Sequence, residues 1–246
     1  MKPERLPITE IWVYLSGSPL FALVITLLAY QTGLFLYQRW GRNPLANPVG
    51  IAIVIVAVTI HLIDMPYAEY FKGAQFVHFL LGTATVSLAV PIYRGIHNIG
   101  SRALPLFAAL ISGGLVSMVS AVGLAMAMGA EPMIVRSMVA KSITAPIAMG
   151  VAQSIGASPT LTAVFAVVTG IAGAIMARFI LDFWRVKAWW QRGFAIGIGA
   201  HGIGTSRAFS VHPEAGAYSG LAMGLHGVVG AFAIPWMLPL IDRLVG

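Results

Sequence analysis

Residues 141–148 read KSITAPIA, a short run that places a cation, two hydroxyls and a proline in apolar surroundings. Proline has no backbone N–H to donate, and a hydrocarbon interior has no water to satisfy the groups that a broken helix leaves open. Such a break therefore persists only against protein or beside a wet cavity. Because Lys141 would cost about 2.5–3.5 kcal/mol at the centre of a bilayer, the run predicts a functional site.

A second stretch of the chain repeats this pattern. The run SLAVPI at residues 87–92 aligns with SITAPI at residues 142–147, and a glycine follows four residues after each proline. Two interrupted apolar segments at matching places in two halves indicate a transporter whose binding site lies near the bilayer midplane. We therefore predict a weak internal repeat, with helix breaks at Pro91 and Pro146.

The composition places the chain in a membrane. Of its 246 residues, 58% are hydrophobic and 9% are charged, and the mean hydropathy is +0.85. A soluble domain carries roughly 25% charged residues. At ~20 residues per helix, about six to eight spans fit, so we predict an all-α polytopic membrane protein with broken or re-entrant segments. We expect one transmembrane domain over residues 1–246.

The positions of the charged residues argue against nucleic-acid binding and suggest how the chain is oriented in the membrane. The net charge is +7, but the cations are scattered through short loops, which favours the positive-inside rule over nucleic-acid binding. The apolar run after the first residues is too long for a cleavable signal, so we expect no targeting peptide. If residues 138–152 enter the membrane and return, the basic loops after residues 37, 93 and 183 share the cytoplasmic face. The N-terminus then lies outside.

Apolar periods divide the chain into segments. We predict a short half-helix before Pro19, full spans at 19–37, 48–63, 105–129, 159–183 and 216–241, and interrupted segments at 74–92 and 138–152. A polar loop is expected at 64–73. Tryptophans among basic residues at 184–192 indicate a membrane interface.

Two glycine patterns lie in the last third of the chain. Five glycines occupy the twelve positions 193–204, and each costs a helix about 1 kcal/mol relative to alanine. We therefore predict unwound backbone there, with breaks at Gly202 and Gly204. A stripe of glycines (Gly216, Gly220, Gly224, Gly227, Gly230) predicts close contact with another helix, either in this chain or in a second copy.

The broken segments together suggest an anion site. The N-terminus of a half-helix offers unpaired amides and a positive dipole, to which hydroxyls and a cation would add. The candidate substrate-binding residues are Thr83, Thr85, Ser87, Lys141, Ser142, Thr144, His201 and Thr205. Arg207, Glu214 and His201 are candidates for charge or coupling, since a histidine with an ordinary pKa of about 6.5 suits proton coupling.

Each of these residues also has a structural interpretation. Membrane hydroxyls often bond to their own helix or to a neighbouring one, and Lys141 could extend to an interface. Arg207 could be a topology charge, His201 could bond backbone carbonyls, Glu214 could cap the last helix, and His226 is interpreted as packing. The sequence has no cysteine, and it shows no metal-ligand spacing, paired carboxylates or nucleophile with a base. We therefore expect that the protein is not an enzyme and that it binds neither a cofactor nor a metal.

Four tracts resemble the LrgB/CidB family: LLGTATVSLAVPIY at 80–93, KSITAPIA at 141–148, AHGIGTSRA at 200–208 and EAGAYSGLAM at 214–223. Two positions depart from the family pattern, because Thr83 follows Gly82 where a proline is common, and Ala145 stands where a second threonine is common. The family includes bacterial proteins named for holin and antiholin behaviour, and the C-terminal half of the plastid glycolate/glycerate translocator. Some members are linked to pyruvate uptake.

The resemblance implies a carrier of small monocarboxylates (glycolate, glycerate or pyruvate) in the bacterial inner membrane, possible proton coupling, and a smaller LrgA/CidA-type membrane partner. The alternative is a holin-like or antiholin-like oligomer that modulates membrane permeability and murein hydrolase activity. A third alternative is a purely structural partner of the small protein. Saturable, selective uptake would favour the carrier, and leakage of unrelated solutes would favour the holin-like protein. A purely structural partner would show neither uptake nor leakage.

Overall fold

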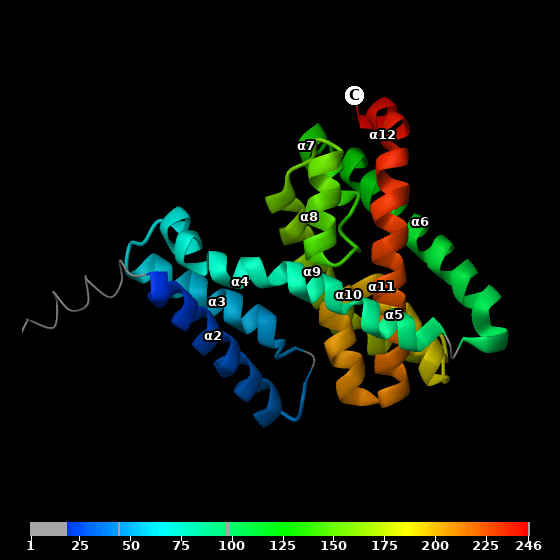
Figure 1. Cartoon of the computed structure of the whole chain (residues 1–246), viewed down its shortest axis with the longest axis horizontal. Helices are drawn as coiled ribbons and strands as arrows, with labels where there is room; N and C mark the ends of the chain where they lie inside the picture. Colours follow the sequence, from blue (N-terminus) through cyan, green and yellow to red (C-terminus); the bar gives the residue numbers. More distant parts are fainter. Residues whose placement is uncertain (1–18, 44, 97–98, 246) are drawn as a thin grey trace, which may run out of the picture. The chain divides into compact units, whose positions relative to one another are not determined.

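The computed structural model describes residues 19–43, 45–96 and 99–245, and these residues form helices and connecting turns without any strand. They divide into two compact units, one ending at Thr83 and the other beginning at Ala84 (Figure 1). The predicted all-α class is confirmed. The half-helix predicted before Pro19 falls outside the described residues.

The first unit contains α2 (Pro19–Arg39), α3 (Pro48–Leu62) and most of α4 (Tyr67–Ser87). Asn47 caps α3, because its side-chain Oδ1 accepts from the backbone N–H groups of Val49 and Gly50 at 3.0 and 3.1 Å. α2 and α3 pack closely, since Gly33 lies directly against the Pro48 backbone. A loop was predicted at residues 64–73, and this prediction is wrong for residues 67–73, because α4 already begins at Tyr67.

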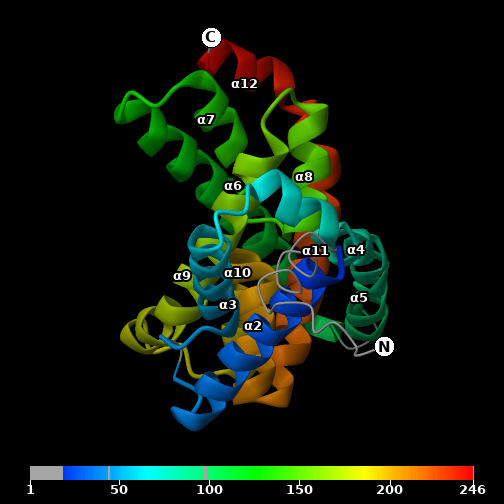
Figure 2. The same ribbon diagram turned by 90° about the vertical axis from the view of Figure 1, so that its left-hand side faces the viewer.

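The second unit holds the remaining helices, including the short ones that carry the predicted site. They are α5 (Ala89–Ile96), a 3₁₀ turn at Gly100–Arg102, α6 (Ala103–Ala127), α7 (Pro132–Met138), α8 (Ala145–Ser154), α9 (Pro159–Phe183), α10 (Trp189–Val211), α11 (Pro213–Trp236) and α12 (Leu238–Val245). α7 and α12 lie side by side at one end of this unit (Figures 1 and 2). The predicted last span is divided, because α11 ends at Trp236 and α12 follows it.

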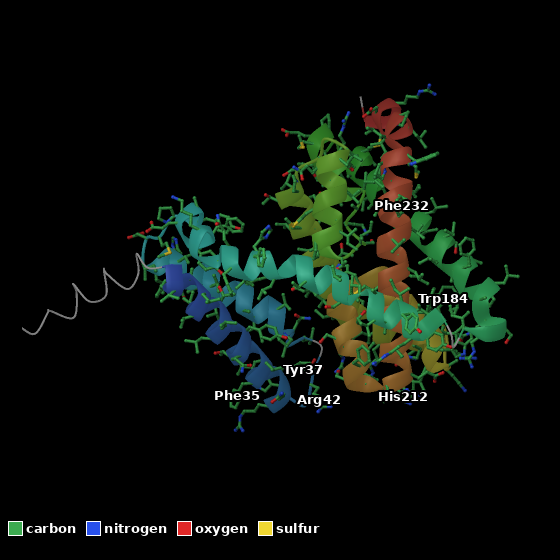
Figure 3. The ribbon with its side chains drawn as sticks, in the orientation of Figure 1. Phe35, Tyr37, Arg42, Trp184, His212 and Phe232 are labelled. Carbon is green, nitrogen blue, oxygen red and sulfur yellow. The ribbon has the colours of Figure 1, made fainter. Side chains whose placement is uncertain are left out.

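Helix length and hydropathy identify the membrane-crossing elements. Four helices of the described chain are long and apolar enough to span a bilayer: Leu20–Arg39, Gly100–Ala127, Pro159–Phe183 and Pro213–Trp236. Large apolar side chains such as Phe35 and Phe232 remain exposed on them, at 61% and 71% (Figure 3). Water would not stabilise such a surface but lipid would, so the chain is a multi-pass membrane protein.

Both predicted breaks exist, and both have the same local form. The first separates α4 from α5 at Leu88, and the second is the irregular stretch 139–144 between α7 and α8. In each case the proline lies just after the break, in the first turn of the next helix, where its missing N–H removes no helical hydrogen bond. Pro91 and Pro146 therefore mark the starts of new helices and not the breaks themselves.

The second break belongs to an excursion that returns to its starting point. The Ser137 side chain, in the last turn of α7, accepts from the Ser158 backbone N–H at 3.1 Å, and the Thr162 hydroxyl donates to the Ser137 carbonyl at 2.9 Å. Residues 138–157 thus leave and rejoin the same place. With 10 residues, α8 is too short to cross a bilayer, which agrees with the predicted re-entrant segment.

Unwound backbone over most of residues 193–204 is a wrong prediction, but a break does occur within the run. At His201, where φ is 37° and ψ is −130°, two helices meet, and the chain turns back there, because Trp189 and His212 at the two ends of α10 stack with their ring centroids 4.7 Å apart. Gly202 and Gly204 themselves lie in helix. The glycines serve packing instead. A Cβ on Gly193 would meet the Ala215 carbonyl, and a Cβ on Gly197 would meet the Ser219 carbonyl. Without side chains at these positions, α10 and α11 approach at backbone distance.

The glycine stripe of α11 is occupied within the chain. A Cβ on Gly220 would lie 3.1 Å from Pro91, and a Cβ on Gly224 would lie 2.5 Å from Ile92. Farther along the same helix, Gly227 and Gly230 receive Ile147 and Ile143. The segments after the two breaks therefore pack one after the other on α11.

Candidate functional site

Lys141 lies in the irregular stretch between α7 and α8 and forms a cluster with two serines. Its Nζ donates to Ser117 Oγ on α6 and to Ser142 Oγ, each at 3.0 Å, and the two hydroxyls are 2.6 Å apart. Ser142 is buried and Lys141 is half-buried. Within the described residues Lys141 forms no ion pair, so its positive charge has hydroxyl partners but no neutralising carboxylate.

The N-terminus of α8 begins beside this cluster. Thr144 is the N-cap residue, and its side chain makes no capping hydrogen bond, while its carbonyl accepts from the N–H groups of Ile147 and Ala148 at 3.0 and 2.9 Å. Helix N-termini carry partial positive charge from amides without helical partners. The helix dipole and the Lys141 ammonium therefore favour the same kind of ligand, an anion.

The kink in α10 places His201 in the interior. Its imidazole Nε2 is 2.8 Å from the Ala166 carbonyl of α9, and its ring packs over Gly170, where a Cβ would come within 2.7 Å of Cε1. The Thr205 hydroxyl donates to the His201 carbonyl at 2.7 Å. A positive φ strains a residue other than glycine, and here both the side chain and the carbonyl at the kink have hydrogen-bond partners.

Thr205 connects the kink to α11 and to the first broken segment. Its hydroxyl lies 2.8 Å from Ser219 Oγ and 3.8 Å from Met223 Sδ. Thr205 and Met223 also line a cavity of about 400 Å³ between α5, α10 and α11, together with Pro91, Arg94 and Tyr218. Thr144 is near the same region, because a Cβ on Gly202 would lie 3.9 Å from its hydroxyl and 3.7 Å from Met223 Sδ.

Two residues of this region were not predicted as site residues. Ser117 lies on α6, and His226, on α11, was interpreted as packing. His226 is buried, and its Nδ1 has no hydrogen-bond partner within the described residues. The only sequence signals were a hydroxyl inside a long apolar helix and an ionisable residue within the glycine stripe.

The hydroxyls before the first break lie on a different kind of backbone from Ser142 and Thr144. The Thr83 side chain is exposed and donates to the Leu80 carbonyl of its own helix at 2.8 Å, as the structural interpretation holds. Ser87 is also exposed, and the Thr85 side chain falls outside the described residues. Because α4 remains helical through Ser87, the hydroxyls at Thr83 and Ser87 lie on helical backbone, unlike those of the second break.

Arg207 and Glu214 lie in other surroundings. Arg207 lines a pocket with Arg178, Asp182 and Arg192. Glu214, in the first turn of α11, is 3.7 Å from Arg102. The N-cap of α11 is His212, whose Nδ1 accepts from the Glu214 N–H at 3.2 Å, so the expectation that Glu214 caps this helix is wrong.

Comparison with known proteins finds a family model and relatives that match most of the chain, including the four tracts quoted above. The model described as the LrgB-like family matches residues 26–240. A protein of Bacillus subtilis (strain 168) named uncharacterized protein YxaC is 30% identical over 213 residues, 87% of this chain and 92% of that protein. The holin-like protein CidB of Staphylococcus aureus (strain Mu50) is 27% identical over 221 residues, 90% of this chain and 96% of that protein. No solved structure is significantly similar to the chain.

Proposed function

This chain belongs to the LrgB-like family of membrane proteins, and from that premise we propose that it carries small monocarboxylates across the bacterial inner membrane. The observation that supports the proposal most directly is the Lys141 ammonium. It is half-buried, is held by Ser117 and Ser142, lacks a carboxylate partner within the described chain, and lies beside the N-terminus of α8. A carboxylate would supply the missing negative charge.

The surrounding groups suit the class of substrate that the family resemblance implies. Glycolate, glycerate and pyruvate present a carboxylate and a neighbouring hydroxyl or carbonyl oxygen. In the proposed complex Lys141 neutralises the carboxylate, and Ser142 and Thr144 donate to its oxygens. His201 is the proposed proton-coupling residue, because it is a buried imidazole at the kink of α10 whose Nε2 lies 2.8 Å from the Ala166 carbonyl. The proposed transport involves no chemical reaction of the substrate and uses no cofactor or metal.

Uptake into liposomes tests the function. The protein, reconstituted with the small LrgA/CidA-type protein proposed as its partner, is expected to accumulate labelled glycolate or pyruvate with saturable kinetics. Lys141→Ala should abolish that uptake, because the anion loses its counter-charge. Lys187→Ala is the matched control, since Lys187 is exposed in the loop before α10, and it should leave uptake unchanged.

Absence of uptake with both proteins present, or equal uptake by the Lys141→Ala and Lys187→Ala variants, would contradict the proposal. Uptake by this chain alone would show that the partner is not obligatory. A pH gradient imposed across the same liposomes separates proton-coupled uptake, which the gradient accelerates, from uniport.

A second candidate function has support from the relatives named holin-like protein CidB. A holin-like role predicts leakage of solutes unrelated to carboxylates, and leakage that does not change in Lys141→Ala. The glycine stripe of α11 adds nothing to this candidate, because its glycines already receive Pro91, Ile92, Ile143 and Ile147 of the same chain.

A further inference from the structure

A positively charged pocket lies where α9 ends and α10 begins. Its volume is about 350 Å³, and among the described residues its lining includes Arg178, Arg192 and Arg207 and one acid, Asp182. Asp182 pairs with Arg192 at 2.7 Å and with Arg178 at 3.7 Å. One carboxylate shared by the two guanidinium groups of Arg178 and Arg192 leaves an excess of positive charge, and guanidinium binds phosphate oxygens in bidentate geometry.

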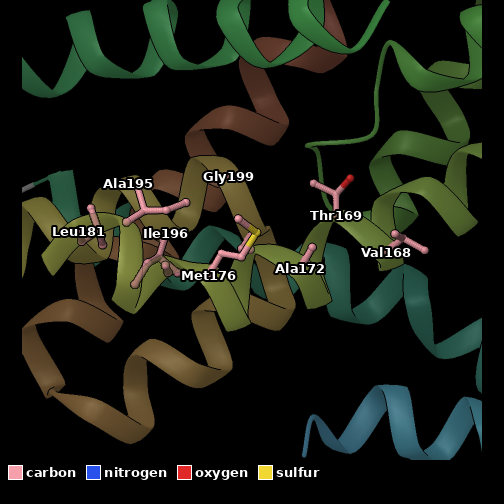
Figure 4. Close-up of a pocket in the computed structure, with 12 residues that line it drawn as sticks. Val168, Thr169, Ala172, Met176, Leu181, Ala195, Ile196 and Gly199 are labelled. Carbon is pink, nitrogen blue, oxygen red and sulfur yellow. The ribbon is translucent and has the colours of Figure 1, made fainter. Parts of the chain in front are cut away.

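An apolar groove continues from this pocket. It has a volume of about 430 Å³ and runs between α9 and α10, with Leu181 and Ala195 at one end and Val168 and Thr169 at the other (Figure 4). Ala177 and Ile196 line both the groove and the charged pocket. The two spaces therefore form one continuous site, charged at one end and apolar along its length.

The surroundings of this site place it against lipid. α9 is one of the four spanning helices, and its side chains along the groove, such as Val168 and Met176, are exposed at 59% and 52%. Trp184 and Trp189 flank the charged end, as tryptophans do at the level of lipid headgroups. From residue 181 to residue 168 the groove covers roughly 20 Å of helix, which is somewhat more than the ~15 Å of one leaflet and lies within a ~30 Å hydrocarbon core.

We propose that this site binds one anionic phospholipid, with the headgroup phosphate on Arg178 and Arg207 and an acyl chain in the groove between α9 and α10. Charge at the interface and an apolar groove pointing toward the bilayer centre match the two parts of such a lipid. A free phosphate or carboxylate would use only the charged pocket. This inference is independent of the proposed transport at Lys141.

Thermal unfolding of the purified full chain in detergent, with added lipid, tests the proposal. Phosphatidylglycerol should raise the unfolding midpoint more than phosphatidylcholine does, because the ligand stabilises the folded state. Arg178→Gln and Arg207→Gln should each weaken the apparent affinity for phosphatidylglycerol about fivefold. Arg243→Gln, which removes an exposed arginine of α12, should bind it as the unchanged protein does.

A further variant separates the lipid from a free anion. Ala172→Phe keeps every charge but places a large apolar side chain at an exposed position of the groove. It should abolish the effect of phosphatidylglycerol and leave any effect of inorganic phosphate unchanged. Equal stabilisation by phosphatidylglycerol and phosphatidylcholine would overturn the proposal. It would also be overturned if inorganic phosphate stabilised the protein as much as phosphatidylglycerol does and Ala172→Phe changed neither effect. Native mass spectra in which Ala172→Phe removes a dimer and not a bound lipid would overturn it as well.

Discussion

Lys141 shows how a membrane protein can hold a positive charge on hydroxyl groups. Its ammonium donates to Ser117 and Ser142, and the two hydroxyls, 2.6 Å apart, are linked to each other. Hydrogen bonds to charged groups are worth about 1.5–3 kcal/mol, and exposure of part of the side chain lowers that value. The hydroxyls thus stabilise the cation while leaving it able to attract an anion.

Ser117→Ala is expected to disturb this site from the neighbouring helix. Removing one of the two hydroxyl partners of the ammonium should lower the free energy of unfolding by about 1 kcal/mol, and should reduce carboxylate uptake where uptake is measured. Chemical denaturation in detergent gives the first quantity. Ser120→Ala is the control on the same helix, because Ser120 is exposed and bonds only within α6. Equal loss of stability in both variants would contradict the assignment of Ser117.

The sequence was enough to predict Lys141, Ser142 and Thr144 as candidate site residues, because they lie close together and all precede one proline. It could not identify Ser117, whose contact with Lys141 joins residues 24 positions apart, nor the orientation of His226. The hydroxyls at Thr83 and Ser87 were predicted on the strength of the sequence echo. In the structure both residues lie on α4, which is helical through Ser87, and the backbone breaks at Leu88. The sequence repeat alone could not show the exact position of that break.

At the scale of elements, α10 and α11 are joined by glycines of α10. Helix propensity argues against five glycines in twelve residues, yet the helix forms, because contact with the α11 backbone outweighs the intrinsic cost of roughly 1 kcal/mol per glycine. Intrinsic propensity could therefore not predict the state of residues 193–204. Only His201 departs from helical backbone there.

Gly197→Ala and Gly199→Ala provide a matched pair on α10. A Cβ on Gly197 would collide with the Ser219 carbonyl, which is backbone and cannot rotate away, whereas a Cβ on Gly199 meets nothing within 4 Å. Gly197→Ala should lower the free energy of unfolding by about 1–3 kcal/mol. Gly199→Ala should leave it unchanged or raise it by up to about 1 kcal/mol. If thermal unfolding in detergent ranks the two variants the other way, the close α10–α11 contact is wrong.

At the scale of the whole chain, composition and apolar periods were sufficient for the class of fold and for most helix positions. α9 spans Pro159–Phe183, as predicted, and α2 and α3 begin at their predicted prolines. Apolar periods could not locate α4 and α12, whose ends depend on local turns. A re-entrant segment was predicted over residues 138–152, from the break at Pro146 and the loop charges, and the excursion in the structure runs slightly farther, over residues 138–157.

Cysteine accessibility tests that excursion, and the chain suits the method because it has no native cysteine. Glu131 and Ser154 are exposed at the beginning and end of the α7–α8 segment. Glu131→Cys and Ser154→Cys should react with a membrane-impermeant thiol reagent from the same side. Lys187→Cys, beyond the spanning helix α9, should react from the opposite side. Labelling of Glu131→Cys and Ser154→Cys from opposite sides would show that residues 138–152 cross the membrane.

The glycine stripe of α11 has a mechanical consequence. The segments after both breaks rest on a helix face without side chains, at Gly220 and Gly224 for one and at Gly227 and Gly230 for the other. Each of these gaps receives a side chain of a broken segment, Pro91 and Ile92 in one case and Ile147 and Ile143 in the other. Lengthwise movement would drive those side chains against the larger residues between the glycines, so the stripe fixes where each segment sits along α11, and bulkier residues at the four positions would push both segments away from it.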